Sequence, residues 1–159
     1  MFLLVSKFTL RALVLSIVLS LSANAQMYEW TTPIGNSLVG NLPILENKSC
    51  GMFAENNAIS YVTGNFSNTA NFGNYNLTSS GATDIFFCKI GNNGNIIWAV
   101  KAGSSYSGAT WSSEHLECGY GIAGDYTGAL YLTGQFNGTA TFGTQTVTSS
   151  GRSDIFLAK

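Results

Sequence analysis

An internal repeat constrains the fold of this chain more than any other feature. Residues 61–89 read YVTGNFSNTANFGNYNLTSSGATDIFFCK, and residues 131–159 read YLTGQFNGTATFGTQTVTSSGRSDIFLAK. The two stretches align without a gap at an offset of 70 residues (131 less 61). About 16 of roughly 29 aligned positions are identical, far more than chance produces. The chain therefore contains at least two copies of one supersecondary unit.

Residues 1–25 have the features of a signal peptide. Lys7 and Arg11 provide a positive n-region, and an apolar stretch of about ten residues follows. An Ala-Asn-Ala cleavage site ends at Ala25, so the mature chain is expected to begin at Gln26. A stretch of this length is too short to span a bilayer, which requires about 20 apolar residues. We therefore expect an exported protein, extracellular or at the cell surface, with no membrane span after signal removal.

The charge of the remaining chain excludes two classes of partner. The sequence has 7 Lys and Arg and 8 Asp and Glu, and the signal peptide accounts for two of the basic residues, which leaves a formal charge of −3. Such a chain is not basic enough to indicate binding to nucleic acid or to an anionic membrane. Charged residues make up 9% of the sequence and aromatic residues 13%, a balance that favours a secreted β protein over a disordered one.

Three cysteines, Cys50, Cys88 and Cys118, are an odd number for a chain that enters an oxidising compartment. One disulfide at most can form within the chain, and the spacing favours no particular pair. Cys88 lies in an apolar run, and its counterpart in the second copy is Ala158. Buried small hydrophobic residues are therefore the simpler interpretation, at least for Cys88.

Apolar and alternating runs in both copies predict antiparallel strands. In the first repeat unit, 49–102, we expect strands at 51–54, 59–66 and 85–90 and around Trp98. The run 85–90 (IFFCKI) is almost continuously apolar, which predicts a strand buried on both faces. In the second unit, 118–159, the expected strands are 120–123, 130–136 and 155–159, and the counterpart of the Trp98 strand is missing.

Residues 26–40 form a third, partial element. Trp30 in this segment resembles Trp98, so the mature chain is expected to start on the last strand of a unit. Such a strand could complete the sheet formed by the C-terminal strands and close a ring. In the isolated chain we expect two sheets packed face to face and an unpaired N-terminal strand.

These units predict an all-β fold made of antiparallel four-stranded β-propeller blades, about two blades in an incomplete ring. A single sheet with apolar residues on both faces cannot bury them alone, and radial stacking of such sheets solves this problem. A closed propeller takes at least four blades. The chain is therefore expected to be a fragment of a longer protein or to associate with itself through open strand edges.

The second unit resembles the bacterial SBBP (β-propeller) repeat. The resemblance is carried by GYGIAGDYTGALYLTGQFNGTATFG and TSSGRSDIFLAK, and a diverged version covers residues 51–98. The first unit has ENNA (55–58) where the second has DYTG (125–128), so a role tied to Asp125 does not transfer to it. The resemblance implies an extracellular or surface-associated propeller module within longer exported proteins, in a family largely without assigned chemistry.

Three aspartates are weak calcium candidates. Asp84 and Asp154 occupy the same position in both copies, before an apolar strand, and Asp125 lies in a predicted turn. Carboxylates are suitable calcium ligands, but no dense Asp/Asn/Gly loop surrounds these residues. A carboxylate that accepts backbone N–H groups and fixes the SSGxxD turn is the favoured interpretation. No other cofactor is expected.

A second candidate site surrounds the single histidine, His115, with Glu114, Glu117 and Cys118 nearby. A metal site needs three or four convergent ligands, and a Cys–His nucleophile needs a third, orienting group. A solvated histidine in a variable loop is the favoured interpretation.

Aromatic residues recur at equivalent positions and offer a third candidate surface. Three tyrosine and phenylalanine pairs and Trp98 could stack on a sugar; the pairs are Tyr61/Tyr131, Phe66/Phe136 and Phe72/Phe142. Packing between units is the favoured interpretation, because the pairs follow the repeat.

The sequence therefore predicts a non-catalytic binding or scaffold module with an unknown extracellular ligand, either protein or glycan. The loop 103–117 would carry its specificity. The first alternative is an extracellular propeller-type glycosidase or lyase, which needs paired carboxylates facing one site. Its candidates, Glu114, Glu117 and Asp125, lie close together in one unit. The second alternative is a structural repeat that assembles with copies of itself.

Overall fold

The described part of the chain is all-β. The computed structural model describes residues 30–35, 47–55, 58–107, 116–125 and 127–159, and within these ranges it contains antiparallel sheets and no helix. None of these described residues therefore forms a helix long and apolar enough to cross a membrane. The first unit comprises β1 (Lys48–Glu55), β2 (Ile59–Phe66), β3 (Thr69–Phe72), β4 (Tyr75–Thr78), β5 (Asp84–Ile90) and β6 (Ile96–Ser104). The second comprises β7 (Cys118–Gly124), β8 (Leu130–Phe136), β9 (Thr139–Phe142), β10 (Gln145–Thr148) and β11 (Asp154–Ala158).

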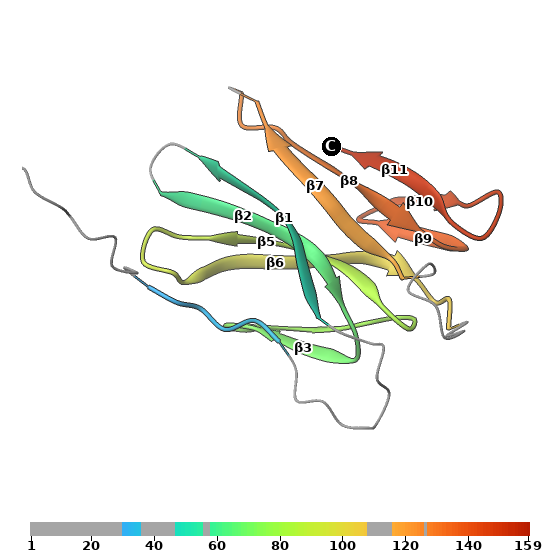
Figure 1. Ribbon diagram of the computed structural model, residues 1–159, viewed down its shortest axis with the longest axis horizontal. Coiled ribbons are helices and arrows are strands. Elements are labelled where there is room, and N and C mark those ends of the chain that lie inside the picture. The colour runs from blue at the N-terminus through green and yellow to red at the C-terminus, as the bar shows by residue number, and fades with distance from the viewer. Residues whose placement is uncertain (1–29, 36–46, 56–57, 108–115, 126) are drawn as a thin grey trace, which may run out of the picture.

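Each unit has the strand order that the repeat predicts. In the first unit β1, β2, β5 and β6 pair in that order, and in the second β7, β8 and β11 pair in the corresponding order. The two sheets pack on one another in Figure 1: β7 lies across β1, β2 and β5, and Ile85 of the first sheet shares a hydrophobic cluster with the second. The predicted face-to-face packing is therefore present, and none of the described sheets closes on itself.

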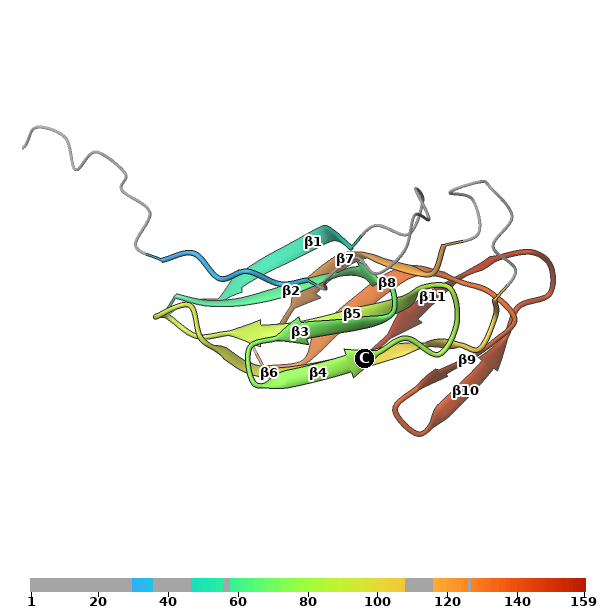
Figure 2. The same ribbon diagram turned by 90° about the horizontal axis from the view of Figure 1, so that it is seen from below.

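A short hairpin interrupts each unit between its second and third principal strands. The turns of the two hairpins contain Gly73 and Gly143, both with a φ of 62°, a left-handed conformation that glycine adopts without strain. The β3–β4 hairpin forms a separate two-stranded sheet, whereas β9 pairs with the end of β6. The second hairpin thereby extends the first sheet to six strands (Figure 2). The sequence did not predict this exchange between units.

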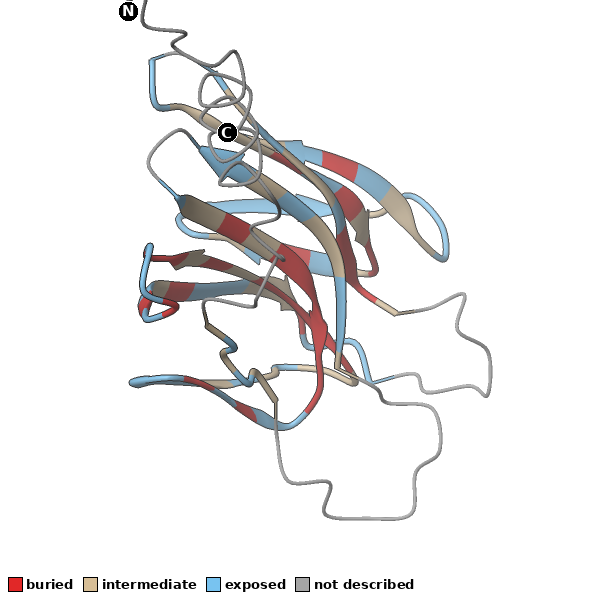
Figure 3. Cartoon of the chain, turned by 60° about the vertical axis from the view of Figure 1, so that its left-hand side comes forward, coloured by how far each residue is buried: buried red, intermediate tan, exposed pale blue. Residues whose placement is uncertain are grey.

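The strand β5 is buried on both faces, as its continuous apolar run predicts. Phe86 and Cys88 belong to a cluster with Phe66 and Phe72 on one side of the sheet. Ile85 belongs to the second cluster, which it forms with four residues of the second unit, Leu132, Phe136, Ala140 and Phe156. The buried segments of Figure 3 accordingly run through the middle of the first sheet. Two hydrophobic layers therefore share β5.

Glycines on β7 and β1 let the two sheets approach closely. A Cβ atom at Gly119 would lie 2.1 Å from Thr63 Oγ1, on β2 of the first unit. A Cβ at Gly51 on β1 would lie 2.8 Å from the carbonyl oxygen of Tyr120. Larger side chains at these positions would hold the sheets apart, so the spacing between units depends on glycine.

The N-terminal segment 30–35 repeats the end of β6. Gly35 and Asn71 form an isolated antiparallel bridge, with N–H···O distances of 2.8 and 3.3 Å. Gly103, which follows Trp98 as Gly35 follows Trp30, pairs in the same way with Thr141, the counterpart of Asn71. This segment therefore lies on the first unit much as β6 lies on the second. The expectation of an unpaired strand was wrong in this respect, because one bridge is present; the rest of 26–40 lies outside the described residues.

Candidate functional site

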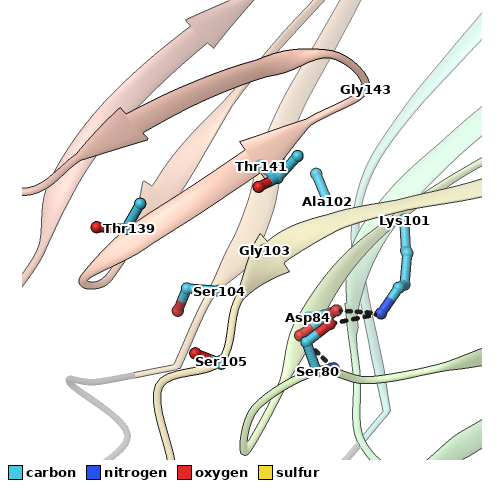
Figure 4. Close-up of a pocket in the computed structure, with 10 residues that line it drawn as sticks. All are labelled: Ser80, Asp84, Lys101, Ala102, Gly103, Ser104, Ser105, Thr139, Thr141 and Gly143. Atoms are coloured by element: carbon cyan, nitrogen blue, oxygen red, sulfur yellow. Dashed lines mark hydrogen bonds and ion pairs between the residues drawn. The ribbon is translucent and has the colours of Figure 1, made fainter.

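A polar cleft separates the two units where β6 meets the second hairpin. Its volume is about 470 Å³. Figure 4 shows side chains of β5 and β6 on one side and of β9 on the other. The lining is rich in hydroxyl groups and small residues: Ser80, Asp84, Lys101, Ala102, Gly103, Ser104, Ser105, Thr139, Thr141 and Gly143.

Asp84 and Lys101 are the charged residues of this cleft. Asp84 is 1% exposed, and its Oδ1 accepts the backbone N–H of Ser80 at 3.0 Å and that of Gly81 at 3.4 Å. Lys101 Nζ lies 3.1 Å from Asp84 Oδ2 and also donates to Ser80 Oγ and to the carbonyl oxygen of Thr78. The carboxylate thus fixes the turn before β5, as the sequence interpretation favoured, and its charge is neutralised within the cleft.

The other two calcium candidates lie elsewhere. Asp154 Oδ2 accepts the backbone N–H of Ser150 at 2.8 Å, which repeats the Asp84 turn in the second unit. Asp125 is in the turn after β7, where Oδ1 accepts hydrogen bonds from Thr127 and from the backbone N–H of Ala129. The Thr127 hydroxyl and these N–H groups lower the pKa of Asp125 to about 2. The three candidates do not converge, and calcium binding stays a prediction.

Glu117 has a role that the sequence interpretation missed. It is 2% exposed, and its two carboxylate oxygens accept backbone N–H groups from both units, Ser104 at 2.9 Å and Asn137 at 3.1 Å. Burial raises the pKa of Glu117, and nearby Asp84 raises it further, although the bonded N–H groups lower it. The repeat contained a signal for this role, because a side chain that can accept a hydrogen bond occurs at the same position in both units. In the first unit it is Asn47, the counterpart of Glu117, which accepts the N–H of Ser67 at 3.2 Å.

The carboxylates of Glu117 and Asp84 approach one another at Gly103. A Cβ atom at Gly103 would lie 2.5 Å from Glu117 Oε2 and 2.9 Å from Asp84 Cγ. The φ of Gly103 is 150°, so both space and backbone conformation require glycine here. Asp125 lies at the opposite end of β7 from Glu117. Glu117 and Asp125, two of the candidate carboxylates for a glycosidase or lyase, therefore do not form one site.

The histidine cluster is only partly described. His115 and Glu114 lie outside the described residues, while Cys118 is buried and lies next to Cys50. Burial raises the pKa of the Cys118 thiol, which makes it a weak nucleophile at neutral pH. No group of three or more His, Cys, Asp or Glu side chains that could hold a metal occurs among the residues that the structure describes.

The repeated aromatic residues pack against each other within each unit. Phe66 and Phe72 meet edge to face with centroids 5.9 Å apart, and Phe136 and Phe142 do so at 6.2 Å. Tyr61 is 6% exposed and lies 6.2 Å from the ring of Trp98. These contacts are those of a packed interior within a unit, whereas the sequence interpretation favoured packing between units. Packing between units is present where Phe136 shares a cluster with Ile85 of the first unit and Phe142 packs against that cluster.

Family models and curated sequences give no relative for this chain. No family model matches it, and no curated protein matches its sequence. The resemblance to the SBBP repeat therefore stays a prediction.

Proposed function

We propose that this chain is an exported, non-catalytic β-propeller-type repeat module with a scaffold role, and that its units stack on further units of the same kind. Support comes from the two units themselves, because the second stacks on the first through positions that recur in the repeat. Cleavage between Ala25 and Gln26, read by N-terminal sequencing of the secreted protein, tests the export that this proposal includes.

One observation carries the scaffold role. Ile85 is 1% exposed and, with partly buried Phe87, packs against the second unit. The same positions of the second unit hold Ile155 and Leu157, which are 86% and 76% exposed. Exposed apolar side chains on one face of a sheet indicate an interaction surface. In the first unit, the side chains at these two positions bind the unit that follows. In the second unit, the side chains at the same positions are exposed and available to bind another unit.

The opposite end of the stack has the complementary feature. Ile122 on β7 packs against the cluster between the units. Its counterpart on β1, Met52, is 68% exposed. A second copy of the chain could therefore place its β1 face on the Ile155 and Leu157 face of the first copy. Such a head-to-tail contact uses two different surfaces and can be repeated.

Self-association of the mature chain tests this proposal. We expect its weight-average mass, measured by sedimentation equilibrium, to rise with concentration. The double variant Ile155→Asp/Leu157→Asp should remain monomeric, because a buried unpaired charge at this contact is costly. Val147→Asp is a matched control, since Val147 is 42% exposed but lies on the second hairpin. A wild-type chain that stays monomeric at all concentrations, or a control variant that dissociates equally, would contradict the proposal.

A ligand-binding role for the polar cleft is the second candidate. Its support is the group of hydroxyl side chains there, including Ser104, Thr139 and Thr141, which suits a small polar ligand such as a glycan. A glycan array tests it, with Thr141→Val as the variant expected to lose binding. The enzyme alternative has less support, because the carboxylates of Asp84 and Glu117 are occupied by backbone N–H groups and Lys101. Hydrolysis of a glycan by the purified chain would favour that alternative.

A further inference from the structure

Two of the three cysteines lie in contact across the boundary between the units. Cys50 Sγ and Cys118 Sγ are 3.1 Å apart. Cys50 is on β1 of the first unit, and Cys118 begins β7 of the second. The two residues are 68 positions apart in the sequence, so their contact results from the stacking of the sheets.

We propose that Cys50 and Cys118 form a disulfide that links the two units covalently. The backbone geometry favours it, because β7 packs on β1 so closely that a Cβ at Gly51 would lie 2.8 Å from the carbonyl oxygen of Tyr120. A disulfide has an S–S distance of about 2.05 Å, so the sulfur atoms need to approach by only about 1 Å. We expect rotation of the two side chains to supply this movement.

The third cysteine is set apart from this pair. Cys88 is 0% exposed and belongs to the hydrophobic cluster formed with Phe66, Phe72 and Phe86 in the first unit. Burial raises the pKa of Cys88 to about 11, so its thiol is unreactive at neutral pH. The odd number of cysteines is thereby explained: one pair bridges the units, and one thiol acts as a small apolar side chain.

The reaction requires a disulfide oxidant, either oxidised glutathione or the disulfide of a thiol–disulfide oxidoreductase. Cys50 is half-buried and Cys118 is 3% exposed, so we expect the oxidant to meet Cys50 first. The Cys50 thiolate attacks one sulfur of the oxidant and expels the other as a thiolate, which leaves a mixed disulfide. Cys118 then loses its proton and attacks Cys50 Sγ, expelling the second thiolate. The two thiols lose two protons and two electrons in total, and the oxidant becomes two thiols.

The charge of Lys48 assists the second step. Burial and the neighbouring Cys50 raise the pKa of Cys118, while Lys48 lowers it. Lys48 precedes Cys50 by two residues on β1 and occupies the repeat position of Cys118. Its ammonium group therefore favours the thiolate that closes the bond. Once Cys50 carries the mixed disulfide, its own thiol no longer opposes ionisation of Cys118.

Peptide mapping of the purified full chain tests the pairing directly. The chain is reduced, freed of reductant, oxidised with oxidised glutathione and digested with trypsin and a glutamate-specific protease together. Trypsin alone leaves Cys50 and Cys88 in one peptide, whereas cleavage after Glu55 separates them. We expect the peptide 49–55 to be linked to a peptide that begins at Cys118, and one thiol to remain per chain in denaturant. The test needs no export, so its failure is distinct from failure of the proposed location.

Three variants complete the test. Cys88→Ala, which places the residue of the second unit (Ala158) at this position, should form the same bridge and leave no free thiol. Cys50→Ser and Cys118→Ala should form no internal bridge. Oxidation should raise the Tm of the wild type and of Cys88→Ala by roughly 10 °C and leave that of Cys50→Ser unchanged, because the bridge closes a long loop. A bridge that contains Cys88, a disulfide between chains, or three free thiols after oxidation would overturn the proposal.

Discussion

The two repeat units make the same internal contacts but differ in what covers them. Thr63 Oγ1 donates to the carbonyl oxygen of Phe86 at 2.8 Å, and Thr133 Oγ1 donates to that of Phe156 at 2.8 Å. Lys89 Nζ lies 5.3 Å from the ring centroid of Tyr61, and the corresponding distance in the second unit, from Lys159 to Tyr131, is 5.5 Å. These contacts are therefore properties of the repeat.

The burial of each unit depends instead on its neighbour. Thr63 is 0% exposed because Gly119 of the second unit covers it. Its counterpart Thr133 is exposed, and its hydroxyl bonds to Phe156 within the same sheet. The tyrosine hydroxyls show a similar difference in surroundings. Tyr61 bonds to Glu55 and is buried, while Tyr131 bonds to Asp125 and is half-buried. The comparison teaches that the repeated sequence determines the contacts within each unit. How much a residue contributes to the free energy of unfolding depends on whether another unit stacks on it.

Equivalent isoleucines should give the largest difference between the units. We expect Ile85→Ala to lower the free energy of unfolding by about 2–5 kcal/mol, because it leaves a cavity between the sheets. Ile155→Ala, on an exposed face, should change the free energy of unfolding by less than about 0.5 kcal/mol. Urea denaturation at a concentration where the chain is monomeric measures both values. Equal losses at the two positions would show that stacking does not bury the first unit.

The close approach of the sheets gives the second prediction. A Cβ at Gly119 would lie 2.1 Å from Thr63 Oγ1, so Gly119→Ala should force the sheets apart and cost about 1–3 kcal/mol of unfolding free energy. The counterpart of Gly119 in the first unit is Ser49, which already carries a Cβ. Ser49→Ala is therefore the matched control and should be nearly neutral in the same denaturation experiment.

A third prediction concerns the carboxylate that joins the units. Glu117→Gln should cost about 1–3 kcal/mol at neutral pH, because the amide NH₂ cannot accept one of the two backbone N–H groups from Ser104 and Asn137. Asn47→Ala removes the corresponding bond to Ser67 and is the comparison in the first unit. Denaturation of both variants at neutral pH gives the two losses.

The same variant has a defined pH dependence. The folded-state pKa of Glu117 is raised above its usual value of 4.5, so its contribution to stability is fully present below that pH and is lost as the pH rises through the raised pKa. The difference in unfolding free energy between wild type and Glu117→Gln should therefore be larger in acid than at neutral pH. A difference that stays constant across this range would contradict the raised pKa.

The smallest effect is expected at Asp125. Its pKa is lowered to about 2 by hydrogen bonds from Thr127 and Ala129, so its contribution is present above the ordinary value of 3.8 and is lost as the pH falls towards 2. Asp125→Asn should remove this part of the acid transition. Tm measured between pH 5 and pH 2 checks it, and an unchanged acid transition would contradict it. Glu55, at the same repeat position, is a suitable control through Glu55→Gln.

Much of the fold follows from local sequence patterns. The predicted strands at 59–66 and 130–136 coincide with β2 and β8 at both ends, because alternation and turn residues define them without reference to the rest of the chain. The strand at 51–54 was predicted too short, since β1 extends over Lys48–Glu55 through an irregularity between Ser49 and Gly51. A bulge breaks the period of two on which the prediction depended.

The candidate site was less predictable. Asp84 was recognised because it recurs as Asp154, and its turn hydrogen bonds are local. The cleft and the role of Glu117 were missed, because they depend on the pairing of β9 with β6, between strands of different units. Glu117 and Ser104 are brought together only when the second unit stacks. The alternation of apolar and polar residues along a strand does not indicate which strands of different units pair.

The sequence by itself determined the repeat, the antiparallel strands and the turn chemistry, since these depend on side chains a few positions apart or on an exact internal copy. Tertiary structure alone decided which copy is buried. Ile85 and Ile155 stand in nearly the same local sequence, yet one is in the core and the other is exposed. It also brought Cys50 to Cys118, which no spacing indicated. The physical reason is that burial and contacts between distant residues arise only when two sheets pack together. The pattern of strands, in contrast, depends on the sequence of each sheet alone.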